Sequence, residues 1–426
     1  MNKAVLVNKE NKIKESFYKH LELITIKNKS NKELQIEKET YNNYLKLEEY
    51  LKEKGIAIDI EKAYISTAVE NSEYNTALAL SIKIDSKYYE ELYKSLHKFG
   101  FILRYPKNKE IITGYEYNPT HIRYVGKIIS KIIYENNWTL EEYLKEFSGV
   151  IVINKEKDMT SFDVVNEISH LFGIKKVGHT GTLDPLAEGV LIVCIGKATK
   201  IVELLTAKDK EYIAEVKLGI KTDSYDITGN ILAEKEVKEI NNLEEVIYSF
   251  KKTYLQEVPI YSAVKVNGKK LYEYARNNKE VELPKKEVTI KDIELLSKEK
   301  DTFKIRTLVS KGTYIRSLIN DIGNELNTYA TMTSLIRTKQ GKVTINEAFK
   351  LSDIKNNNFK VYNIEETLEY PVVKVNEEIE YKITNGVKLD NTFDIKDKVI
   401  FVNKDGKLLG IYEKDNEILK VWKNFM

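Results

Sequence analysis

The stretch Gly178–Leu191, GHTGTLDPLAEGVL, places a single carboxylate, Asp184, between a turn of small residues and an apolar run. Gly178 and Gly181 allow tight backbone turns, and Pro185 restrains the chain directly after the acid. An aspartate before a proline is also typical of a plain turn or a helix N-cap. This stretch alone therefore leaves a structural and a catalytic interpretation of Asp184 open.

Length and composition predict a globular protein of two or three domains. The chain has 426 residues, of which 42% are hydrophobic and 31% charged, so it has enough apolar material for more than one core. The net charge of +3 is nearly balanced, so a nucleic-acid partner would have to be bound by local basic patches. The single cysteine, Cys194, excludes an internal disulfide and a thiolate zinc cluster.

The chain is expected to be cytoplasmic. Its first 16 residues, MNKAVLVNKENKIKES, lack the apolar core of a signal peptide. No later run approaches the roughly 18 apolar residues that a membrane-spanning helix needs. We therefore expect no contact with a membrane.

Three regions differ in sequence pattern, with predicted domains at 1–147, 148–368 and 369–426. No Gly/Ser/Pro linker separates them, so either the domains abut tightly or a helix ending near Phe147 connects them. The patterns predict helices over 38–55, 86–100, 161–173 and 315–326, with Thr160 or Ser161 as an N-cap, and strand-like segments over 56–60, 101–106, 149–155, 212–222 and 303–316. Short strands near the C-terminus, over 399–403, 408–414 and 417–422, predict a small β module.

A carboxylate that acts as a nucleophile must be held in place, partly desolvated, and kept ionised by a cation from elsewhere in the fold. Three segments accompany the Asp184 stretch: DKEYIAEVKLG (209–219), VPIYSAVKVNGKKLYEYAR (258–276) and SKGTYIRSLINDIG (310–323). In content and order the four segments resemble the TruB family of tRNA pseudouridine-55 synthases, over about Gly149 to Phe349. Members of that family isomerise one uridine in the T-loop of tRNA to pseudouridine without a cofactor or metal.

The resemblance implies a role for six residues of this chain. Asp184 matches the catalytic aspartate, Arg316 the arginine that pairs with it, and Tyr212 the active-site tyrosine that stacks on the flipped base. Three further positions match substrate-binding residues: His179, which fills the space left by the flipped nucleotide, Leu335, which lines the uracil pocket, and Lys155. As plain core or surface residues, Leu335 and Tyr212 would look the same in the sequence.

One segment departs from the family pattern. The usual opening DKPxGxTS reads NKEKDMTS here, so Asn154, Glu156 and Asp158 replace Asp, Pro and Gly, whereas Lys155 is retained. Aspartate tolerates the left-handed backbone conformation better than most residues, so we expect the turn to survive. Basic segments at 173–179, 196–200, 266–276, 310–316 and 336–342 suit a surface that follows RNA phosphates.

The N-terminal region resembles the D-alanyl-D-alanine carboxypeptidases of the VanY type, which are zinc enzymes. The segments AYIS, SEYNTALALSI, LHKFGFILRYP and GYEYNPTHIRYVG carry this resemblance. Catalytic zinc needs several protein ligands, an open position for water and a general base. Here the positions of the first histidine, the aspartate, the glutamate and the substrate arginine hold Tyr74, Ser81, Asn118 and Ile65, and only His121 is retained.

The predicted fold class is α+β. The resemblances imply a pseudouridine-synthase core with a mainly antiparallel sheet and flanking helices, a small C-terminal PUA-like β module, and an N-terminal zinc-peptidase-like domain. We expect a monomer that acts on the T-arm stem-loop of tRNA with no cofactor and no metal. Two alternatives are a non-catalytic protein that binds or folds RNA, and a zinc D,D-carboxypeptidase with an RNA-binding accessory domain.

Overall fold

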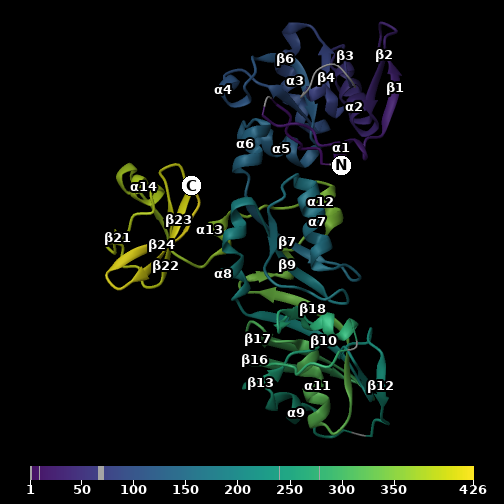
Figure 1. The fold of residues 1–426 in the computed structure, drawn as a ribbon, viewed down its shortest axis with the longest axis vertical. Coiled ribbons are helices and arrows are strands. Elements are labelled where there is room, and N and C mark those ends of the chain that lie inside the picture. Colours follow the sequence, from purple (N-terminus) through teal and green to yellow (C-terminus); the bar gives the residue numbers. More distant parts are fainter. Residues whose placement is uncertain (1, 9, 66–71, 239, 278) are drawn as a thin grey trace.

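The computed structural model describes residues 2–8, 10–65, 72–238, 240–277 and 279–426. The molecule is elongated (Figure 1), with the N-terminal region at one end, a large central body below it, and a small C-terminal module at the side. No helix among the described residues is both long and apolar enough to cross a membrane.

The N-terminal region is built on a four-stranded antiparallel sheet in the order β3-β4-β6-β5. The helix predicted from residue 38 is present as α2 (Lys38–Glu53), which buries Leu47 and Leu51. The strand predicted over 56–60 begins only at Asp59, because the chain first turns at Gly55 (φ 74°) and Ile56 N–H still bonds to the carbonyl of Leu51. The remaining elements are α1 (Glu15–Tyr18), β1 (Leu23–Lys27), β2 (Glu33–Glu37), β3 (Asp59–Lys62), β4 (Ala79–Lys83), α3 (Tyr89–Leu96), β5 (Phe101–Tyr105), α4 (Glu110–Thr113), β6 (Asn118–Tyr124), α5 (Lys127–Asn136) and α6 (Leu140–Glu146).

The central body contains a nine-stranded sheet, antiparallel except where β18 runs parallel to β9. The main order is β13-β16-β17-β10-β18-β9-β7, with β8 paired to β9 and β19 to β18. The predicted mainly antiparallel sheet is therefore present. Its strands are β7 (Gly149–Lys155), β8 (Val177–His179), β9 (Glu188–Ile195), β10 (Lys210–Leu218), β13 (Thr253–Glu257), β16 (Lys285–Lys298), β17 (Thr302–Val309), β18 (Ala330–Gln340) and β19 (Val343–Thr344).

Helices flank this sheet and begin where the sequence predicts. In α7 (Ser161–Phe172) the Thr160 hydroxyl accepts a hydrogen bond from Asp163 N–H, and the Asp163 carboxylate accepts one from Thr160 N–H in return. The second predicted helix, α11 (Ile315–Glu325), packs Leu318, Ile319 and Ile322 against β18 and β10. Smaller elements are η4 (Gly196–Ile201), α8 (Val202–Thr206), β11 (Ile220–Thr222), β12 (Ile231–Glu234), α9 (Leu243–Ser249), β14 (Lys265–Val266), β15 (Lys269–Lys270), α10 (Leu271–Arg276) and α12 (Leu351–Lys355).

The C-terminal module is a five-stranded sheet, β20-β22-β23-β24-β21, covered by α14 (Glu377–Thr384). Val399 and Phe401 point into the module's own core, whereas Ile400 and Val402 point toward the central body. This is the strand alternation that a two-sided sheet requires. The bounds are α13 (Ile364–Thr367), β20 (Val372–Lys374), β21 (Leu389–Asp390), β22 (Lys398–Val402), β23 (Leu408–Asp415) and β24 (Ile418–Asn424).

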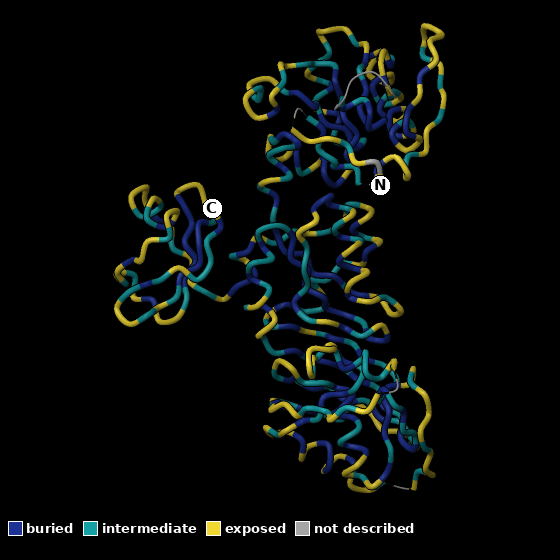
Figure 2. Tube along the Cα trace, in the orientation of Figure 1, coloured by how far each residue is buried: buried dark blue, intermediate teal, exposed yellow. Residues whose placement is uncertain are grey.

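The N-terminal region and the central body share one hydrophobic cluster. The Tyr143 hydroxyl in α6 donates to the carbonyl of Phe172 at 2.7 Å, and Phe147 stacks on Phe172 with ring centroids 5.6 Å apart. Buried segments lie on both sides of this junction (Figure 2) and belong to the same hydrophobic cluster. The N-terminal region and the central body are therefore tightly packed and also connected by α6. The domain boundary at residue 147 stays a prediction.

Candidate active site

A pocket of about 370 Å³ opens between the loop that carries Asp184, strands β10 and β18, and the start of α11. It brings together four of the six predicted site residues, Asp184, Tyr212, Arg316 and Leu335, from parts of the chain up to 151 residues apart. The other lining residues are Thr182, Leu183, Tyr261, Ser262, Ala263, Tyr272, Thr313, Tyr314 and Ile315.

Asp184 and Arg316 form the predicted ion pair. The Arg316 Nε atom lies 3.0 Å from Asp184 Oδ2. The other guanidinium nitrogens donate to the carbonyls of Ser224 (3.1 Å) and Tyr261 (3.0 Å), so the arginine is held on three sides. Only 6% of the Arg316 side chain is exposed, against 37% of the Asp184 side chain. The carboxylate thus remains open to the pocket while its partner is buried.

Two opposing effects act on the Asp184 carboxylate. Burial raises its pKa and Arg316 lowers it, and the buried carboxylate of Asp226, whose Oδ2 is 3.8 Å from Arg316 Nη1, adds a second upward effect. The net direction is upward, so the arginine offsets only part of the cost of burying this charge. A carboxylate that is costly to keep charged gains from sharing its charge with an electrophilic carbon.

Side chains from β18 fix the loop before Asp184. Arg337 donates through Nε to the carbonyl of Val190 at 2.6 Å and through Nη2 to that of Gly181 at 3.0 Å. Gln340 Nε2 donates to the Thr180 hydroxyl at 2.7 Å. Arg337 is 1% exposed, so these bonds act in a buried setting where they are hard to replace with water.

The glycines of the opening stretch differ from the prediction. Gly178 lies in strand β8 and makes no turn, whereas Gly181 lies at a bend, and neither residue has a positive φ. Gly181 is instead close to Arg337, whose Nη1 would be 3.3 Å from an added Cβ. The left-handed position is Gly189 (φ 98°), where a Cβ would meet the carbonyl oxygen of Arg337 at 2.3 Å.

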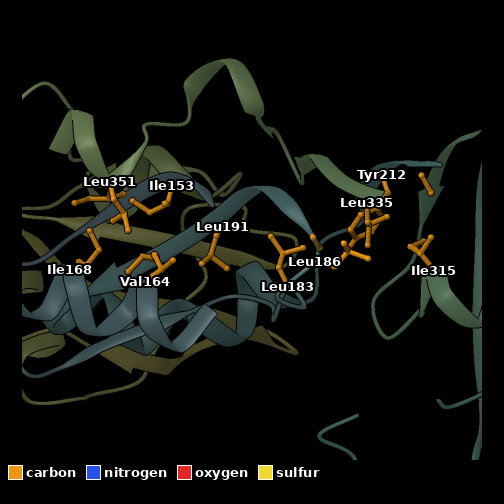
Figure 3. Packing of buried hydrophobic residues seen from close by; sticks show 14 of the residues in the cluster. Ile153, Val164, Ile168, Leu183, Leu186, Leu191, Tyr212, Ile315, Leu335 and Leu351 are labelled. Carbon is orange, nitrogen blue, oxygen red and sulfur yellow. The ribbon is translucent and has the colours of Figure 1, made fainter. Parts of the chain in front are cut away.

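Tyr212 and Leu335 form the apolar side of the pocket. They project from β10 and β18, and Figure 3 shows them side by side, with Ile315 from α11 across from them. Tyr212 is 7% and Leu335 6% exposed. Flat aromatic and aliphatic surfaces on two sides of a carboxylate form a slot suited to a planar heterocycle.

The structure does not bring Lys155 or His179 into the lining of this pocket. Lys155 is buried, and its Nζ donates to the carbonyls of Met159 (2.6 Å) and Glu156 (2.9 Å), so it supports a turn of its own chain. The predicted left-handed residue of that turn is confirmed, with Asp158 at φ 66°. The Asp158 N–H donates to the carbonyl of Pro185 at 2.8 Å, which couples the turn to the residue after Asp184.

His179 ends strand β8, five residues before Asp184. Its Nδ1 atom accepts a hydrogen bond from Gly181 N–H at 3.3 Å, and burial lowers the pKa of the imidazole. A neutral ring is therefore favoured, which suits packing against a base more than contact with a phosphate.

Asp226 is a site residue that sequence reasoning missed. Its Oδ1 accepts hydrogen bonds from the Ser224 hydroxyl (2.9 Å) and Thr228 N–H (3.0 Å), and its Oδ2 faces Arg316. The signal was the polar turn SYDITG, in which an aspartate between hydroxyl residues is typical of an Asx turn. Its burial beside Arg316 could not be seen from that pattern.

Gln256 on β13 was also missed. Its Oε1 accepts from Tyr314 N–H at 2.8 Å, and its Nε2 donates to the Tyr254 hydroxyl at 2.8 Å. That hydroxyl donates to Asp321 Oδ2 at 3.1 Å, about two turns further along α11. Because Tyr314 is the N-cap of α11 and lacks a side-chain cap of its own, β13 clamps the helix that delivers Arg316.

The second predicted constellation, around His121, is closed by aromatic rings. Tyr74 and Tyr105 each place a ring centroid 4.9 Å from that of His121, and Ser81 pairs with His121 across β4 and β6. Burial lowers the pKa of His121 to about 4, and its Nε2 atom has no hydrogen-bond partner among the described residues. Ser66, in the AYIS segment, lies outside the described residues.

Ion pairs hold this part of the N-terminal region together. Arg104 donates to Glu73 at 2.8 Å and to Glu141 at 2.7 Å, and Arg123 pairs with the other oxygen of Glu73. The Glu73 side chain is 1% exposed. Within the described part of the chain, no group of three or more His, Cys, Asp or Glu residues is placed to hold a metal ion.

Comparisons with known families match two parts of the chain. Residues 169–315 match the model of the TruB family pseudouridylate synthase N-terminal domain, and residues 52–127 match the D-alanyl-D-alanine carboxypeptidase model, VanY. The N-terminal region is therefore VanY-like, as its sequence motifs predict.

Relatives with high identity cover about two thirds of this chain. The tRNA pseudouridine synthase B of Fusobacterium nucleatum is 45% identical over 287 residues, which are 65% of this chain and 99% of that protein. The corresponding protein of Clostridium tetani is 41% identical over 286 residues, with the same two coverages.

Solved structures agree on the fold. A Cbf5–Nop10–Gar1 complex matches with a TM-score of 0.51 and 25% identity over 67% of this chain and 87% of that one. An H/ACA RNP bound to a substrate RNA containing 2′-deoxyuridine matches with a TM-score of 0.51 and 23% identity, over 68% and 88%.

Proposed function

The chain belongs to the TruB family of pseudouridylate synthases, isomerases that form pseudouridine in tRNA, and we propose that it acts on uridine 55 of the T-loop with Asp184 as nucleophile. The observation that carries this proposal is the half-open carboxylate of Asp184, 3.0 Å from a buried arginine in a pocket with apolar walls.

The reaction breaks the bond between the ribose C1′ and N1 of uracil, forms a bond between C1′ and C5, removes the proton from C5 and leaves N1 protonated. A nucleophile must therefore bind covalently and leave again, and a carboxylate does both. Asp184 attacks either C1′ of the ribose or C6 of the base. Nothing is oxidised or reduced in either route, so no cofactor is required.

Arg316 orients the attacking carboxylate. Its three separate hydrogen-bond partners fix the guanidinium plane, and the Nε–Oδ2 contact then fixes one oxygen of Asp184. The second oxygen is left to attack. Arg316 also stabilises Asp184 as an anion, which is the form in which the carboxylate is released from the covalent adduct at the end of the cycle.

Tyr212 and Leu335 hold the uracil ring. A base stacked inside an RNA helix or loop must be flipped out before the enzyme can reach it, at a cost of about a few kcal/mol. Stacking on Tyr212 and contact with Leu335 offset part of this cost. His179, just before the Asp184 loop, fills the gap that the flipped base leaves in the RNA.

Lys155 acts indirectly in this proposal. Its ammonium group supports the turn at 156–159, and that turn bonds to the carbonyl of Pro185 next to the nucleophile. The proposal also includes a monomer that works in the cytoplasm, domains at 1–147, 148–368 and 369–426, and a PUA-like nature for the last of these.

The decisive experiment incubates the full chain with unmodified tRNA and maps pseudouridine by position. Pseudouridine at position 55 and nowhere else in the T-arm is expected, and an isolated T-arm stem-loop should also be modified. Binding without pseudouridine would instead favour the non-catalytic RNA-binding alternative. Pseudouridine at another position would support the isomerase reaction but contradict uridine 55 as the target.

A further inference from the structure

The N-terminal segment packs directly on the loop that leads to His179. Gly173 ends α7 at φ 63°, and a Cβ there would lie 2.4 Å from the Ala4 Cβ and 3.1 Å from Asn2 Oδ1. Figure 1 shows the N-terminus beside α7 and α12. The segment and the loop are therefore packed against each other and line one cavity.

A cavity of about 830 Å³ lies between this segment and the loop. Its lining includes the basic residues Lys12, Lys14 and His20 from the segment and Lys175 and Lys176 from the loop, against one acidic residue, Glu10. The side chains of Lys14, Lys175 and Lys176 are exposed. The cavity is thus open and positively charged.

The positive charge continues past Lys176 along the edge of the sheet. Lys200 in η4 donates to the carbonyl of Asn424 in the C-terminal module, and its pKa is lowered by burial and by the nearby charges of Lys176, Lys197 and Lys423. The nearest acid in this group is Glu146 of α6, whose Oε2 lies 3.0 Å from Lys197 Nζ.

Gathering like charges on one surface is unfavourable unless a polyanion covers them. Strand β8 begins directly after Lys176 and ends at His179, so the chain runs from Lys175 and Lys176 toward the loop that carries Asp184. We propose that Lys14, Lys175 and Lys176 bind the phosphate backbone of the tRNA whose uridine enters that pocket. The N-terminal segment before the VanY-like residues 52–127 then forms part of the tRNA-binding surface, an inference that rests on the proposed function.

The test compares two triple variants of the full chain. One carries Lys14→Gln, Lys175→Gln and Lys176→Gln. The matched control carries Lys52→Gln, Lys62→Gln and Lys107→Gln, three exposed lysines of the N-terminal region that do not line the cavity. Both lose the same charge. The affinity for unmodified tRNA is measured by filter binding over a series of KCl concentrations, and folding is checked by thermal unfolding.

The first variant should bind tRNA about tenfold more weakly, and the slope of log Kd against log[KCl] should fall by roughly one unit for each lysine. The control should stay within about twofold of the unaltered protein. Equal losses in both variants, or no loss in the first, would overturn the proposal.

Filter binding reports the affinity for tRNA and does not depend on pseudouridine formation, so this result is separable from that of the proposed function. A protein that binds tRNA through these lysines but makes no pseudouridine would keep the surface and remove the proposed activity. If the first variant binds tRNA with unchanged affinity and still makes pseudouridine, the proposed activity stands and the proposed binding surface is overturned.

Discussion

Two carboxylate–arginine clusters in this molecule differ in the access of the carboxylate to solvent and in the number of arginines that contact it. Glu73 is enclosed by Arg104 and Arg123 with 1% of its side chain exposed, whereas Asp184 pairs with Arg316 and keeps 37% exposed. The first carboxylate has both oxygens occupied by arginines and only holds strands together. The second has an oxygen free in a pocket, so the same residue types provide a reactive group.

The surroundings of Asp184 and of His121 extend this comparison. Around Asp184, all the partners that a carboxylate nucleophile needs are in place. Around His121, the space beside the imidazole is taken by the rings of Tyr74 and Tyr105. A fold therefore outlasts its chemistry when aromatic packing replaces polar ligands, because packing alone keeps the core intact.

Replacement of the nucleophile should have the largest effect. Asp184→Asn keeps the shape and the Arg316 contact but removes the negative charge, so turnover should fall by a factor of about 10⁴ or more. The affinity for tRNA should change less than about twofold, because phosphate contacts remain. Single-turnover pseudouridine formation and filter binding measure the two quantities. Turnover near that of the unaltered protein would contradict the role of Asp184.

Removal of Arg316, the ion-pair partner of Asp184, should cause the second-largest fall in turnover. Arg316→Met should reduce turnover by about 10²–10³ because the carboxylate is no longer oriented. Arg316 lowers the pKa of Asp184, so its removal should raise that pKa further. Since the ionised form is the nucleophile and the rate rises with pH through this pKa, the acid limb of the pH–rate profile should move to higher pH. An unmoved limb would show that Arg316 does not act on Asp184.

The clamp on α11 should have an intermediate effect. Gln256→Leu removes the acceptor for Tyr314 N–H, so we expect about a tenfold fall in kcat with little change in the affinity for tRNA. Gln256→Glu retains an acceptor and should recover most of the loss. Leu255→Ala, at the neighbouring and 65% exposed position of β13, is the matched control and should leave kcat unchanged. A similar loss in Leu255→Ala would indicate a general weakening of the strand.

The smallest effect on tRNA modification is expected from the VanY-like site. The unaltered full chain should contain no stoichiometric zinc and hydrolyse no D-alanyl-D-alanine, because only His121 of the ligand set is present. Combined Tyr74→His, Ser81→Asp and Asn118→Glu substitutions should permit zinc uptake, measured by metal analysis after dialysis, with pseudouridine formation unchanged. Stoichiometric zinc in the unaltered chain would overturn this expectation.

Several features of the protein were predictable from local sequence. The capping pair Thr160 and Asp163, the helix over 315–326 and the left-handed Asp158 are set by neighbours within four residues, so a short window contains their cause. The pairing of Asp184 with Arg316 was predictable only through the family resemblance, because 132 residues separate them.

The sequence by itself determined the residue types, their order and the helical and strand patterns, because propensity and capping are local effects. Only the tertiary structure decided that Lys155 supports a turn outside the pocket, that Asp226 shares Arg316, and that Gln256 clamps the N-cap of α11. These contacts join strands and loops that meet through sheet pairing and helix packing. Their physical basis is the burial of polar groups that must find partners wherever the fold places them, and no sequence window spans that distance.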